Sequence, residues 1–509
     1  MSHTPWMRVV KSGLGRYLRS TSELNRRDFI KISAKTVALG IIATQAFPLR
    51  HALSLGSSKQ EVTVVGGGIA GLTSAYRLAT AGFDVSLFEA QARLGGRIFT
   101  LFNSNKNGQF LELGGEFIDT DHKDILALAR ELGLEIDDFR KEDAGKKHLT
   151  LFFEGKLFSE KEFQRDARPV FKKILHDFIE MDSSAEAFEK LNRIPLDQYL
   201  NSTANLNSWV KSFLKTAYES EYGIPLAEQS ALGMVTLLGS LKESNTPYGT
   251  SDESMRIRGG NSQLISALEE KCKKLGVKFF ISKKLERISG SVKEAITLDF
   301  GESKITSKKV ILTLPLAILR KISGMDSIGL KNETLKAIQE LGMGNNSKSM
   351  MEFSERVWRT KYGQTGNFFS DQDIHCAWET SRAQKGETGI LTHFLTGVTP
   401  PNSNQIPAML TQIEPAIPGI AKTFTKHIGG FSWSEYPYAS GSYSCPKLGQ
   451  WVHKSNPFSI TELNGKLYFA GEHCSVDHMG YMNGAVESAN LVATQVASAT
   501  QSQNKYSNL

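Results

Sequence analysis

The sequence predicts an α/β fold with a buried parallel sheet, and three neighbouring features support that prediction. Glu61–Val65 is a short β-branched run of the kind that forms a buried parallel strand. A GxGxxG turn at residues 66–71 follows directly and leads into a helical pattern from Leu72 to Ala81. Val85–Phe88 then has the pattern of a second strand. Strand, glycine turn, helix and strand in this order indicate a Rossmann-like unit that binds a dinucleotide.

Each glycine of this turn has its own physical role. Gly66 permits the tight turn, Gly68 lets the backbone approach a pyrophosphate, and Gly71 lets the helix pack closely on the strand. The helix N-terminus faces the phosphates, because its free N–H groups favour negative charge. Glu89 closes the second strand, where a carboxylate can accept hydrogen bonds from ribose hydroxyls. These four residues are predicted to bind the dinucleotide.

The charge of the chain is concentrated at its N-terminus. The 509 residues carry a formal net charge of +7 and are 40% hydrophobic, which suits a large globular fold. Residues 1–54 contain nine lysines and arginines and two acidic residues, so the excess positive charge lies in this leader. The remainder is close to neutral and predicts no basic face for nucleic acid.

The leader has the features of an export signal. Asn25–Lys31 (NRRDFIK) resembles the twin-arginine signature. Val37–Phe47 is an apolar run too short to span a bilayer, and Ala52–Ser54 offers an acceptable cleavage site. We therefore expect residues 1–54 to be a signal peptide that engages the twin-arginine translocase. Because that pathway carries folded proteins, the mature chain is expected in the periplasm or outside the cell.

The cysteines predict neither a disulfide framework nor a metal site. The four cysteines, at positions 272, 376, 445 and 474, are far apart and form no CxxC motif. They are expected to be buried free thiols, and no histidine–cysteine set has metal-ligand spacing, so no metal is predicted. The chain has no run of eighteen uncharged apolar residues, and its last twelve residues are polar. No membrane anchor is therefore expected in the mature chain.

Two further glycine pairs follow the first dinucleotide-binding turn and help to identify the cofactor. Gly95 and Gly96 precede Arg97, which adds another close backbone approach and a charge for the pyrophosphate. Gly114 and Gly115 form a further glycine turn. This combination resembles the flavin-containing amine oxidase family, which includes monoamine oxidases, polyamine oxidases and L-amino-acid oxidases. The resemblance runs from about residue 60 to residue 497. It implies a Rossmann-like FAD-binding domain interleaved with an α+β substrate domain.

Later segments strengthen the resemblance. They are Arg258–Asn261 with the helix that it opens over Ser262–Leu275, Lys284–Ile288 with Lys309–Pro315, Trp433–Tyr443, and Tyr468–Ala489. The last is the strongest signal, because it joins a strand, a Gly-Glu pair and the opening of a helix. By this resemblance, Leu285, Gly471, Glu472 and Met482 would bind FAD, with the last helix directed at the flavin ring.

Three residues match catalytic positions of the family. Lys348 matches the lysine that holds a water at flavin N5 and supports reoxidation by O2. The alternation around it also suits an ordinary exposed strand lysine. Tyr443 and Tyr481 match an aromatic pair that flanks the amine, where exclusion of water favours its neutral form. Trp433 is expected to form a wall of the same cavity or to pack as a core residue.

Three departures from the family pattern bear on how the flavin is attached and on which class of substrate is bound. Ser442 stands where monoamine oxidases bond flavin to a cysteine, and Cys445 lies three residues beyond, so FAD should be noncovalent. Phe117 stands where amino-acid oxidases and tryptophan 2-monooxygenases carry a carboxylate-binding arginine. Asp119 occupies the place of the polyamine oxidase acid that attracts a distal ammonium, with Glu116 close by. The alternative for Asp119 and Glu116 is that both lie on a solvated loop and have no role in binding substrate.

The family architecture implies two interleaved domains. The FAD domain would take residues 60–125, 252–330 and 425–500, the substrate domain residues 126–251 and 331–424, and residues 501–509 would form a polar tail. Helical patterns are expected over Lys123–Leu132 and around Phe163–Glu180. A small ligand is expected to bind between the domains.

The leading function is that of an exported FAD-dependent amine oxidase, which converts an amine, O2 and water to an aldehyde, ammonia and hydrogen peroxide. An L-amino-acid oxidase or a tryptophan 2-monooxygenase-like enzyme is a second reading, and it needs a carboxylate-binding group. A flavin desaturase of hydrophobic polyenes is a third. A non-catalytic flavin-binding scaffold belongs to another class. Lys348, Tyr443 and Tyr481 favour the first reading over the last two.

Overall fold

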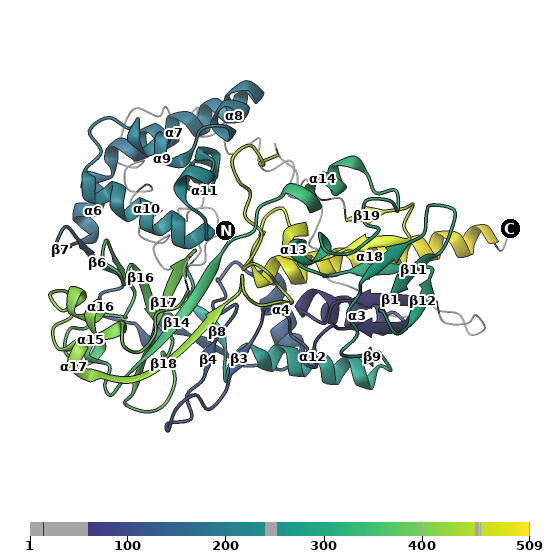
Figure 1. Ribbon diagram of the computed structural model, residues 1–509, viewed down its shortest axis with the longest axis horizontal. Coiled ribbons are helices and arrows are strands. Elements are labelled where there is room, and N and C mark those ends of the chain that lie inside the picture. The colour runs from purple at the N-terminus through teal and green to yellow at the C-terminus, as the bar shows by residue number, and fades with distance from the viewer. Residues whose placement is uncertain are drawn as a thin grey trace.

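The computed structural model describes Leu14 and residues 60–239, 252–397, 399–452, 458 and 460–507, with the backbone alone at 239 and 501–507. Apart from Leu14, the expected signal peptide lies outside the described residues. Figure 1 shows two halves side by side. The half at the right is built on a six-stranded sheet, and the half at the left has a seven-stranded sheet beneath a group of helices.

The six-stranded sheet confirms the predicted α/β unit. Its order is β19-β20-β13-β1-β2-β9, and every neighbouring pair except β19 with β20 is parallel. Its strands are β1 (Glu61–Val65), β2 (Asp84–Phe88), β9 (Lys278–Phe280), β13 (Val310–Leu312), β19 (Thr461–Glu462) and β20 (Leu467–Phe469). β1 is buried after its first residue, as its β-branched composition predicts.

Helices cover one face of this sheet. α3 (Ile69–Thr80) begins three residues before the predicted start, because Gly68 is extended and serves as its N-cap. α12 (Ser262–Lys274) and α18 (Met482–Ser507) pack against α3, and α4 (Lys123–Glu131) packs against α18. α18, close to the C-terminus, therefore packs against α3, the helix that follows the glycine turn.

Antiparallel strands and short helices cover the opposite face. A three-stranded sheet is formed by β10 (Arg287–Ser289), β11 (Ile296–Asp299) and β12 (Lys304–Ser307), and α13 (Leu316–Leu319) and α14 (Asn332–Glu340) lie beside it. Their apolar side chains share one core with Val65 and Phe88. The parallel sheet is thus buried on both faces, which explains its continuous apolar strands.

The other half is built on a mixed seven-stranded sheet of order β18-β14-β17-β16-β15-β6-β7. The strands are β6 (Thr150–Phe153), β7 (Lys156–Phe158), β14 (Asn346–Phe353), β15 (Phe368–Ser370), β16 (Cys376–Glu379), β17 (Gly389–Thr396) and β18 (Phe424–Ser432). Successive residues point to opposite faces, so Leu151 joins one apolar core and Phe152 the other.

Two groups of helices cover the faces of this sheet. One comprises α6 (Glu160–Asp166), α7 (Arg168–Ser183), α8 (Ala185–Asn192), α9 (Leu196–Asn201), α10 (Ser208–Tyr222) and α11 (Ala231–Gly239). The other comprises α15 (Val357–Thr360), α16 (Ile406–Ile413) and α17 (Ile420–Thr423). The helical stretch expected around Phe163–Glu180 is formed by α6 and α7, and Pro169 suits the first turn of the second helix.

The remaining short elements lie around these sheets. They are β3 (Thr100–Leu101), β4 (Leu111–Glu112), β5 (Ile136–Asp138), α5 (Phe139–Glu142), β8 (Met255–Ile257) and the 3-10 turns η2 (Leu226–Glu228) and η3 (Glu472–Cys474). β5 and β8 pair with each other, and β3 pairs with β4.

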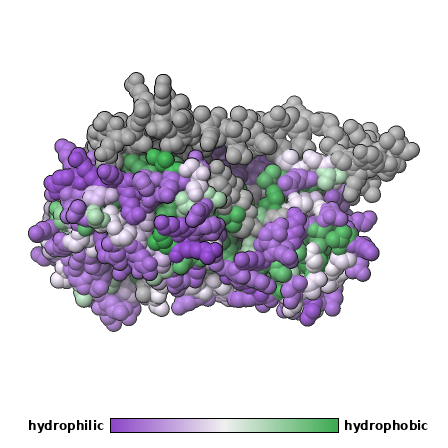
Figure 2. Space-filling model, turned by 90° about the horizontal axis from the view of Figure 1, so that it is seen from above, coloured by the Kyte–Doolittle hydropathy of each residue, from purple (hydrophilic) through white to green (hydrophobic). Residues whose placement is uncertain are grey.

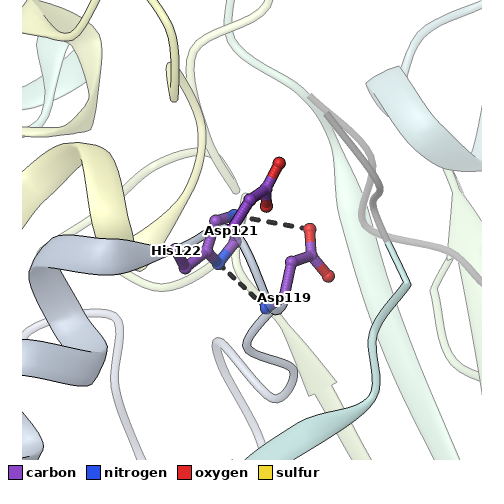
Figure 3. Close-up of side chains that lie close together, drawn as sticks. All are labelled: Asp119, Asp121 and His122. Atoms are coloured by element: carbon purple, nitrogen blue, oxygen red, sulfur yellow. Dashed lines mark hydrogen bonds and ion pairs between the residues drawn. The ribbon is translucent and has the colours of Figure 1, made fainter. Parts of the chain in front are cut away.

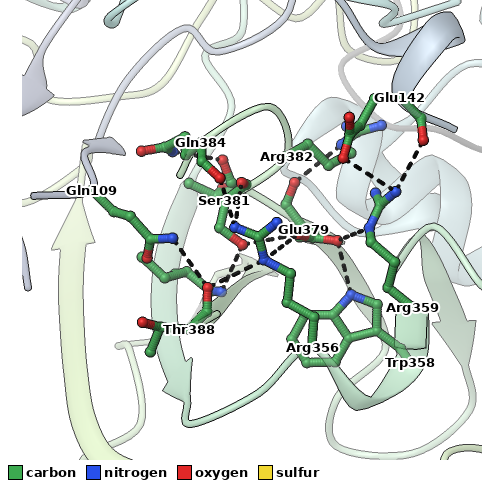
Figure 4. Close-up of polar contacts among 12 residues, drawn as sticks. Gln109, Glu142, Arg356, Trp358, Arg359, Glu379, Ser381, Arg382, Gln384 and Thr388 are labelled. Carbon is green, nitrogen blue, oxygen red and sulfur yellow. Dashed lines mark hydrogen bonds and ion pairs between the residues drawn. The ribbon is translucent and has the colours of Figure 1, made fainter. Parts of the chain in front are cut away.

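A buried charge network fixes the turn after β16 (Figure 4). The Glu379 carboxylate accepts hydrogen bonds from Arg359 Nε and from Trp358 Nε1, each at 2.9 Å. Arg359 also contacts Asp143 at 2.8 Å, and Arg382 contacts the same carboxylate at 3.1 Å. Because every buried charge here has a partner, this network is a structural connection between α5, α15 and the sheet.

The observed elements differ from the expected domain division at two places. β18 falls in the segment from residue 425 that was expected in the FAD domain, yet it pairs with β14 in the seven-stranded sheet. α18 continues through Ser507, into the segment expected as a polar tail. The face in Figure 2 is mainly hydrophilic with smaller hydrophobic areas. No helix among the described residues has the length and apolar character needed to cross a bilayer.

Candidate active site

A cavity of about 670 Å³ is lined by both halves of the molecule. Val65 and Phe88 of the six-stranded sheet lie on its wall, as do Lys348, Trp378 and Phe394 of the seven-stranded sheet. Of the residues predicted from sequence, the lining includes Gly66, Gly68, Glu89, Arg97, Gly114, Gly115, Asp119, Leu285, Lys348, Trp433, Tyr443, Gly471, Glu472, Tyr481 and Met482. Gly71 alone of the predicted set lies behind the wall.

The glycine turn after β1 has the geometry that its sequence predicts. Gly66 has a φ of +108°, a conformation that side chains other than glycine rarely adopt. A Cβ on Gly71 would lie 1.9 Å from the Gly66 carbonyl oxygen, so this position requires glycine for close helix–strand packing. A Cβ on Gly68 would have no neighbour nearer than Gly96 Cα at 3.9 Å. The backbone at Gly68 is therefore open to a ligand.

Glu89 is held at the end of β2 by backbone N–H groups. Its carboxylate accepts hydrogen bonds from Gly67 N at 2.6 Å and from Gln91 N at 2.8 Å. Burial raises the pKa of Glu89 above its ordinary value, although these hydrogen bonds oppose the rise. Leu285 faces the same end of the cavity, where Lys283 and Lys284 also line it. This end combines glycines, a fixed carboxylate and cations, and it fits a dinucleotide.

Arg97 and Glu472 form an ion pair between distant parts of the chain. Arg97 Nη1 lies 2.8 Å from the Glu472 carboxylate and donates to the Ser442 carbonyl at 2.9 Å. Glu472 also accepts from the Ser444 hydroxyl at 3.0 Å and from Gly480 N at 2.9 Å. Burial alone would raise the pKa of Glu472, but Arg97 and its other partners hold it below the ordinary value. Glu472 thereby orders the turn that leads into α18.

The glycine turn at Gly114 and Gly115 packs tightly against the middle of the cavity. A Cβ on Gly115 would lie 2.9 Å from the sulfur of Met482, at the start of α18. Trp433 is buried, and its Nε1 donates to the Leu113 carbonyl at 2.8 Å. Trp433 therefore lines the cavity and is also a buried residue that fixes the turn, so it combines the two roles that were expected as alternatives. Gly114 and Gly115 lie where only a bare backbone fits.

Lys348 is buried, not exposed on the strand. β14 pairs with β17 and β18, and its successive residues are buried on both faces of the sheet. Lys348 Nζ donates to the carbonyls of Glu112 and Gly114, each at 2.9 Å, and to the Glu116 carboxylate at 3.0 Å. Burial would raise the pKa of Glu116, but Lys348 and Arg256 hold it below the ordinary value. Glu116 is thus paired within the protein, which corrects the solvated-loop alternative for it.

The two predicted tyrosines both line the cavity. The Tyr443 hydroxyl donates to the Glu221 carbonyl at 2.5 Å, and burial raises its pKa well above the ordinary value. The Tyr481 ring meets the His122 ring edge to face, with centroids 4.8 Å apart. Ser442, at the position of the family's flavin-bonded cysteine, donates from its hydroxyl to Asn346 at 2.7 Å.

Asp119 is also buried, and the turn around it is compact (Figure 3). Its carboxylate lies 3.4 Å from His122 Nε2, and its backbone N–H donates to His122 Nδ1 at 3.1 Å. Asp121 belongs to the same turn, and donor atoms of the three residues lie within 4.8 Å of one another. The contacts between Asp119 and His122 explain why the side chains of these three residues lie close together. The solvated-loop alternative for Asp119 is therefore wrong.

The cavity also contains residues that the sequence did not single out. Trp378 meets Phe117 edge to face at 5.5 Å, and its Nε1 donates to Glu116 at 3.0 Å. Phe394 and Glu253 lie on the same wall. The apolar strands β16 and β17 indicated buried aromatic side chains, but no local pattern indicated which face would meet a ligand. Glu253, next to Asp252 in a polar stretch, had no sequence signal.

The remaining sequence expectations concern the cysteines. All four are free and buried, as predicted. Burial raises the pKa of the Cys445 thiol above its ordinary value. Cys445 is also absent from the cavity lining among the described residues.

Comparison with known proteins relates this geometry to one family. Residues 69–497 match the family described as flavin-containing amine oxidoreductase. The chain is 23% identical over 477 residues to an L-amino-acid oxidase of Siganus canaliculatus, covering 87% of this chain and 86% of that protein. It is 24% identical over 497 residues to a nicotine dehydrogenase of Pseudomonas putida, covering 92% and 96%. The structure of cyclohexylamine oxidase from Brevibacterium oxydans superposes with a TM-score of 0.72 at 19% identity, covering 87% and 100%.

Proposed function

We propose that this chain, which belongs to the flavin-containing amine oxidoreductase family, oxidises a primary or secondary amine with O2. The products are an aldehyde, ammonia or a smaller amine, and hydrogen peroxide. The family establishes a flavoprotein oxidoreductase that acts on amines. FAD as the flavin, noncovalent binding, and oxygen as the acceptor are parts of the proposal.

The charges on the cavity wall are the main support for an amine substrate. Among its described lining residues, Arg97 is the one arginine, and it is paired with Glu472 beside the nucleotide end. Around Phe117, where amino-acid oxidases carry an arginine, the acidic lining residues are Glu116, Asp119 and Glu253, and the cation Lys348 is paired with Glu116. Carboxylates attract a cation and repel a substrate carboxylate. This arrangement favours an amine over an α-amino acid.

The residues of the chain would hold FAD in a defined orientation. Gly66 and Gly68 would lie at the pyrophosphate and Glu89 at the ribose, while Met482 and the start of α18 would lie beside the ring. Bound flavin would supply the two-electron acceptor for oxidation of the carbon that bears nitrogen. Lys348 would place a fixed positive charge beside the ring, and Tyr443 and Tyr481 would exclude water around the amine.

A panel of substrates tests this function. The purified, yellow protein is mixed without oxygen with monoamines, polyamines and L-amino acids, and the loss of flavin colour is followed. We expect amines to bleach the flavin, and readmitted air to restore the colour with formation of hydrogen peroxide. Bleaching by amino acids alone would establish the second reading, and no bleaching by any compound would favour the desaturase or the scaffold. Bleached flavin that air fails to reoxidise would exclude oxygen as the acceptor.

We also propose that the chain is exported through the twin-arginine translocase. The support is the NRRDFIK segment in the leader, together with a cofactor site that is built from widely separated segments. Such a site forms only in a folded chain, which a pathway for folded proteins can carry.

A further inference from the structure

The ammonium of Lys348 has a buried counterion that the proposed mechanism does not use. Lys348 Nζ donates to the carbonyl oxygens of Glu112 and Gly114, each at 2.9 Å, and to the Glu116 carboxylate at 3.0 Å. An ammonium has three N–H groups, so protein acceptors take all three. The lysine is therefore held in a fixed position, and its positive charge is in contact with a negative one.

Glu116 is kept as a carboxylate by several partners. Its Oε2 atom also accepts a hydrogen bond from Trp378 Nε1 at 3.0 Å, and its Oε1 atom accepts one from the Thr380 hydroxyl at 2.7 Å. The side chain is 2% exposed. Burial alone would raise the pKa of Glu116, but the charges of Lys348 and Arg256 bring it below the ordinary value. Glu116 is therefore ionised at neutral pH and offsets the charge of Lys348.

Arg256 is a second cation near Glu116, but its hydrogen bonds go elsewhere. Its Nη1 atom lies 3.7 Å from the Glu116 carboxylate, which is longer than a hydrogen bond. The guanidinium donates instead to the carbonyl oxygens of Thr380 and Arg382, each at 2.9 Å. Lys348 is therefore the cation that Glu116 contacts directly.

This pairing bears on the oxygen step of the proposed reaction. Reoxidation passes two electrons and two protons from the reduced flavin to O2, which becomes hydrogen peroxide. A positive charge nearby stabilises the negative charge that arises on oxygen with the first electron. A carboxylate in contact with that positive charge weakens the effect, because the fields of opposite charges largely cancel at a distance.

We propose that Glu116 is a positioning residue that acts through Lys348 and restrains the reaction of the reduced flavin with O2. It holds the ammonium in place, and it also lowers the positive potential on the cavity wall. Reoxidation would then be slower than the lysine alone would permit. This inference rests on the proposed flavin and oxygen chemistry, and it names a residue that sets the rate of the oxygen step.

Glu116→Gln tests this role, because a carboxamide keeps the shape of the side chain and loses its charge. Its oxygen can accept from Lys348 and Trp378 while its nitrogen donates to the Thr380 hydroxyl. The flavin is reduced with light and EDTA, so the test needs no amine, and is then mixed with oxygenated buffer in a stopped-flow instrument. We expect the variant to reoxidise about tenfold faster than the wild type.

Glu116→Asp provides a second, graded variant. It keeps the charge but withdraws it from the ammonium by one methylene group. The offset of the lysine charge is then weaker but not lost, so reoxidation should accelerate by only about threefold. If Glu116→Gln does not retain flavin, an unchanged rate in Glu116→Asp overturns the proposal.

The reduction potential of the bound flavin gives a readout that involves no turnover. Loss of a nearby negative charge favours the reduced flavin, so Glu116→Gln should raise the potential measured against reference dyes. A higher potential by itself would slow electron transfer to O2, so a faster reaction at a higher potential identifies stabilisation of charge on oxygen. A buried ammonium without a carboxylate gives up its proton more readily, so rates are measured from about pH 6 to about pH 9, and the acceleration should be greatest at the acidic end.

A cycle of variants attributes the effect to the pair. With Lys348→Met in place, Glu116→Gln should change the reoxidation rate by less than about twofold, because no ammonium charge remains to be offset. Glu352→Gln removes a carboxylate of β14 that lies outside the described cavity lining, and it serves as the control. Denaturant unfolding of the flavin-free proteins measures the same coupling without cofactor: the double variant should be destabilised less than the sum of the single variants.

The outcomes separate this inference from the proposed function. Reoxidation of a folded, yellow Glu116→Gln protein at or below the wild-type rate over the whole pH range would overturn the inference. Equal acceleration with and without Lys348 would also overturn it, because the effect would not pass through the ammonium. If no amine reduces the flavin but the photoreduced variants behave as expected, the proposed function fails and the role of Glu116 stands.

Discussion

Lys348 Nζ lies 3.0 Å from the Glu116 carboxylate, and both side chains are buried. Lys348 comes from β14 of the seven-stranded sheet, whereas Glu116 follows the glycine turn at Gly114 and Gly115. The pair therefore joins the two halves directly at the cavity. It also fixes Lys348, which we propose lies beside the flavin ring.

Lys348→Met should slow reoxidation of the reduced flavin far more than its reduction by substrate. A fixed positive charge stabilises negative charge that develops when O2 accepts electrons, and its loss should cost about a hundredfold in rate. Stopped-flow absorbance measures the two half-reactions separately. Lys336→Met, at an exposed lysine of α14, serves as the control. Equal slowing of both half-reactions would assign Lys348 a structural role only.

Acid precipitation should release the flavin into solution. Ser442 stands at the position of the family's linking cysteine, and Cys445 lies outside the described cavity lining. Serine offers no thiolate to bond the ring. The absorbance of the supernatant and of the washed pellet measures the distribution of the flavin. A pellet that stays yellow would show a covalent link at another residue.

Glu112→Gln should change how stability depends on pH. Burial raises the pKa of Glu112 from 4.5 to about 7, although hydrogen bonds from Asn261 and Thr100 oppose the rise. Between these two values the folded state holds a proton that the unfolded state has lost. The contribution of Glu112 to the free energy of unfolding is therefore fully present below pH 4.5 and declines as the pH rises to about 7, by about 3 kcal/mol.

Denaturant titrations at several pH values compare the wild type with Glu112→Gln. The stability of the wild type relative to the variant should fall by about 2–3 kcal/mol between about pH 5 and about pH 8. A constant difference over this range would mean that Glu112 is ionised throughout. Glu269→Gln, at a partly exposed position on α12, provides a matched control.

Gly71→Ala and Gly68→Ala should fail in different ways. The Cβ at position 71 would overlap the Gly66 carbonyl, so the fold should lose roughly 3 kcal/mol. The Cβ at position 68 meets no atom closer than 3.9 Å, so that protein should fold but bind flavin weakly. Thermal unfolding of the flavin-free proteins and titration with FAD measure the two effects. The same unfolding temperature for both variants would contradict the assigned roles.

Replacement of Arg26 and Arg27 by lysines should block export of the protein. The twin-arginine pathway recognises the arginine pair in its signal, and lysines keep the charge of the leader unchanged. Cell fractionation followed by flavin fluorescence locates the protein. Accumulation of yellow protein outside the cytoplasm at the wild-type level would exclude this route.

Features encoded by neighbouring residues could be predicted from sequence, and features formed by distant residues could not. The turn from Gly66 to Gly71 and the strand that ends at Glu89 depend on local backbone geometry, so their positions were predicted within a few residues. The contact of Arg97 with Glu472 joins residues 375 positions apart, and no local pattern specifies it.

Lys348 and Glu253 show two further limits of sequence analysis. The alternation around Lys348 was compatible with an exposed face, because a pattern of two residues does not reveal that both faces of β14 are buried. Glu253 follows no periodicity at all. Its burial arises from pairing of Met255 with Ile118, which only the assembled fold brings together.

The six-stranded sheet places β20, from near the C-terminus, beside β13 and one strand away from β1, and α18 packs on α3. A nascent polypeptide still short of Leu467 therefore lacks a strand, the turn at Glu472 and the helix that closes the cofactor site. A chain that stops before these segments is therefore expected to stay colourless, because a strand, a turn and a helix of the site are missing.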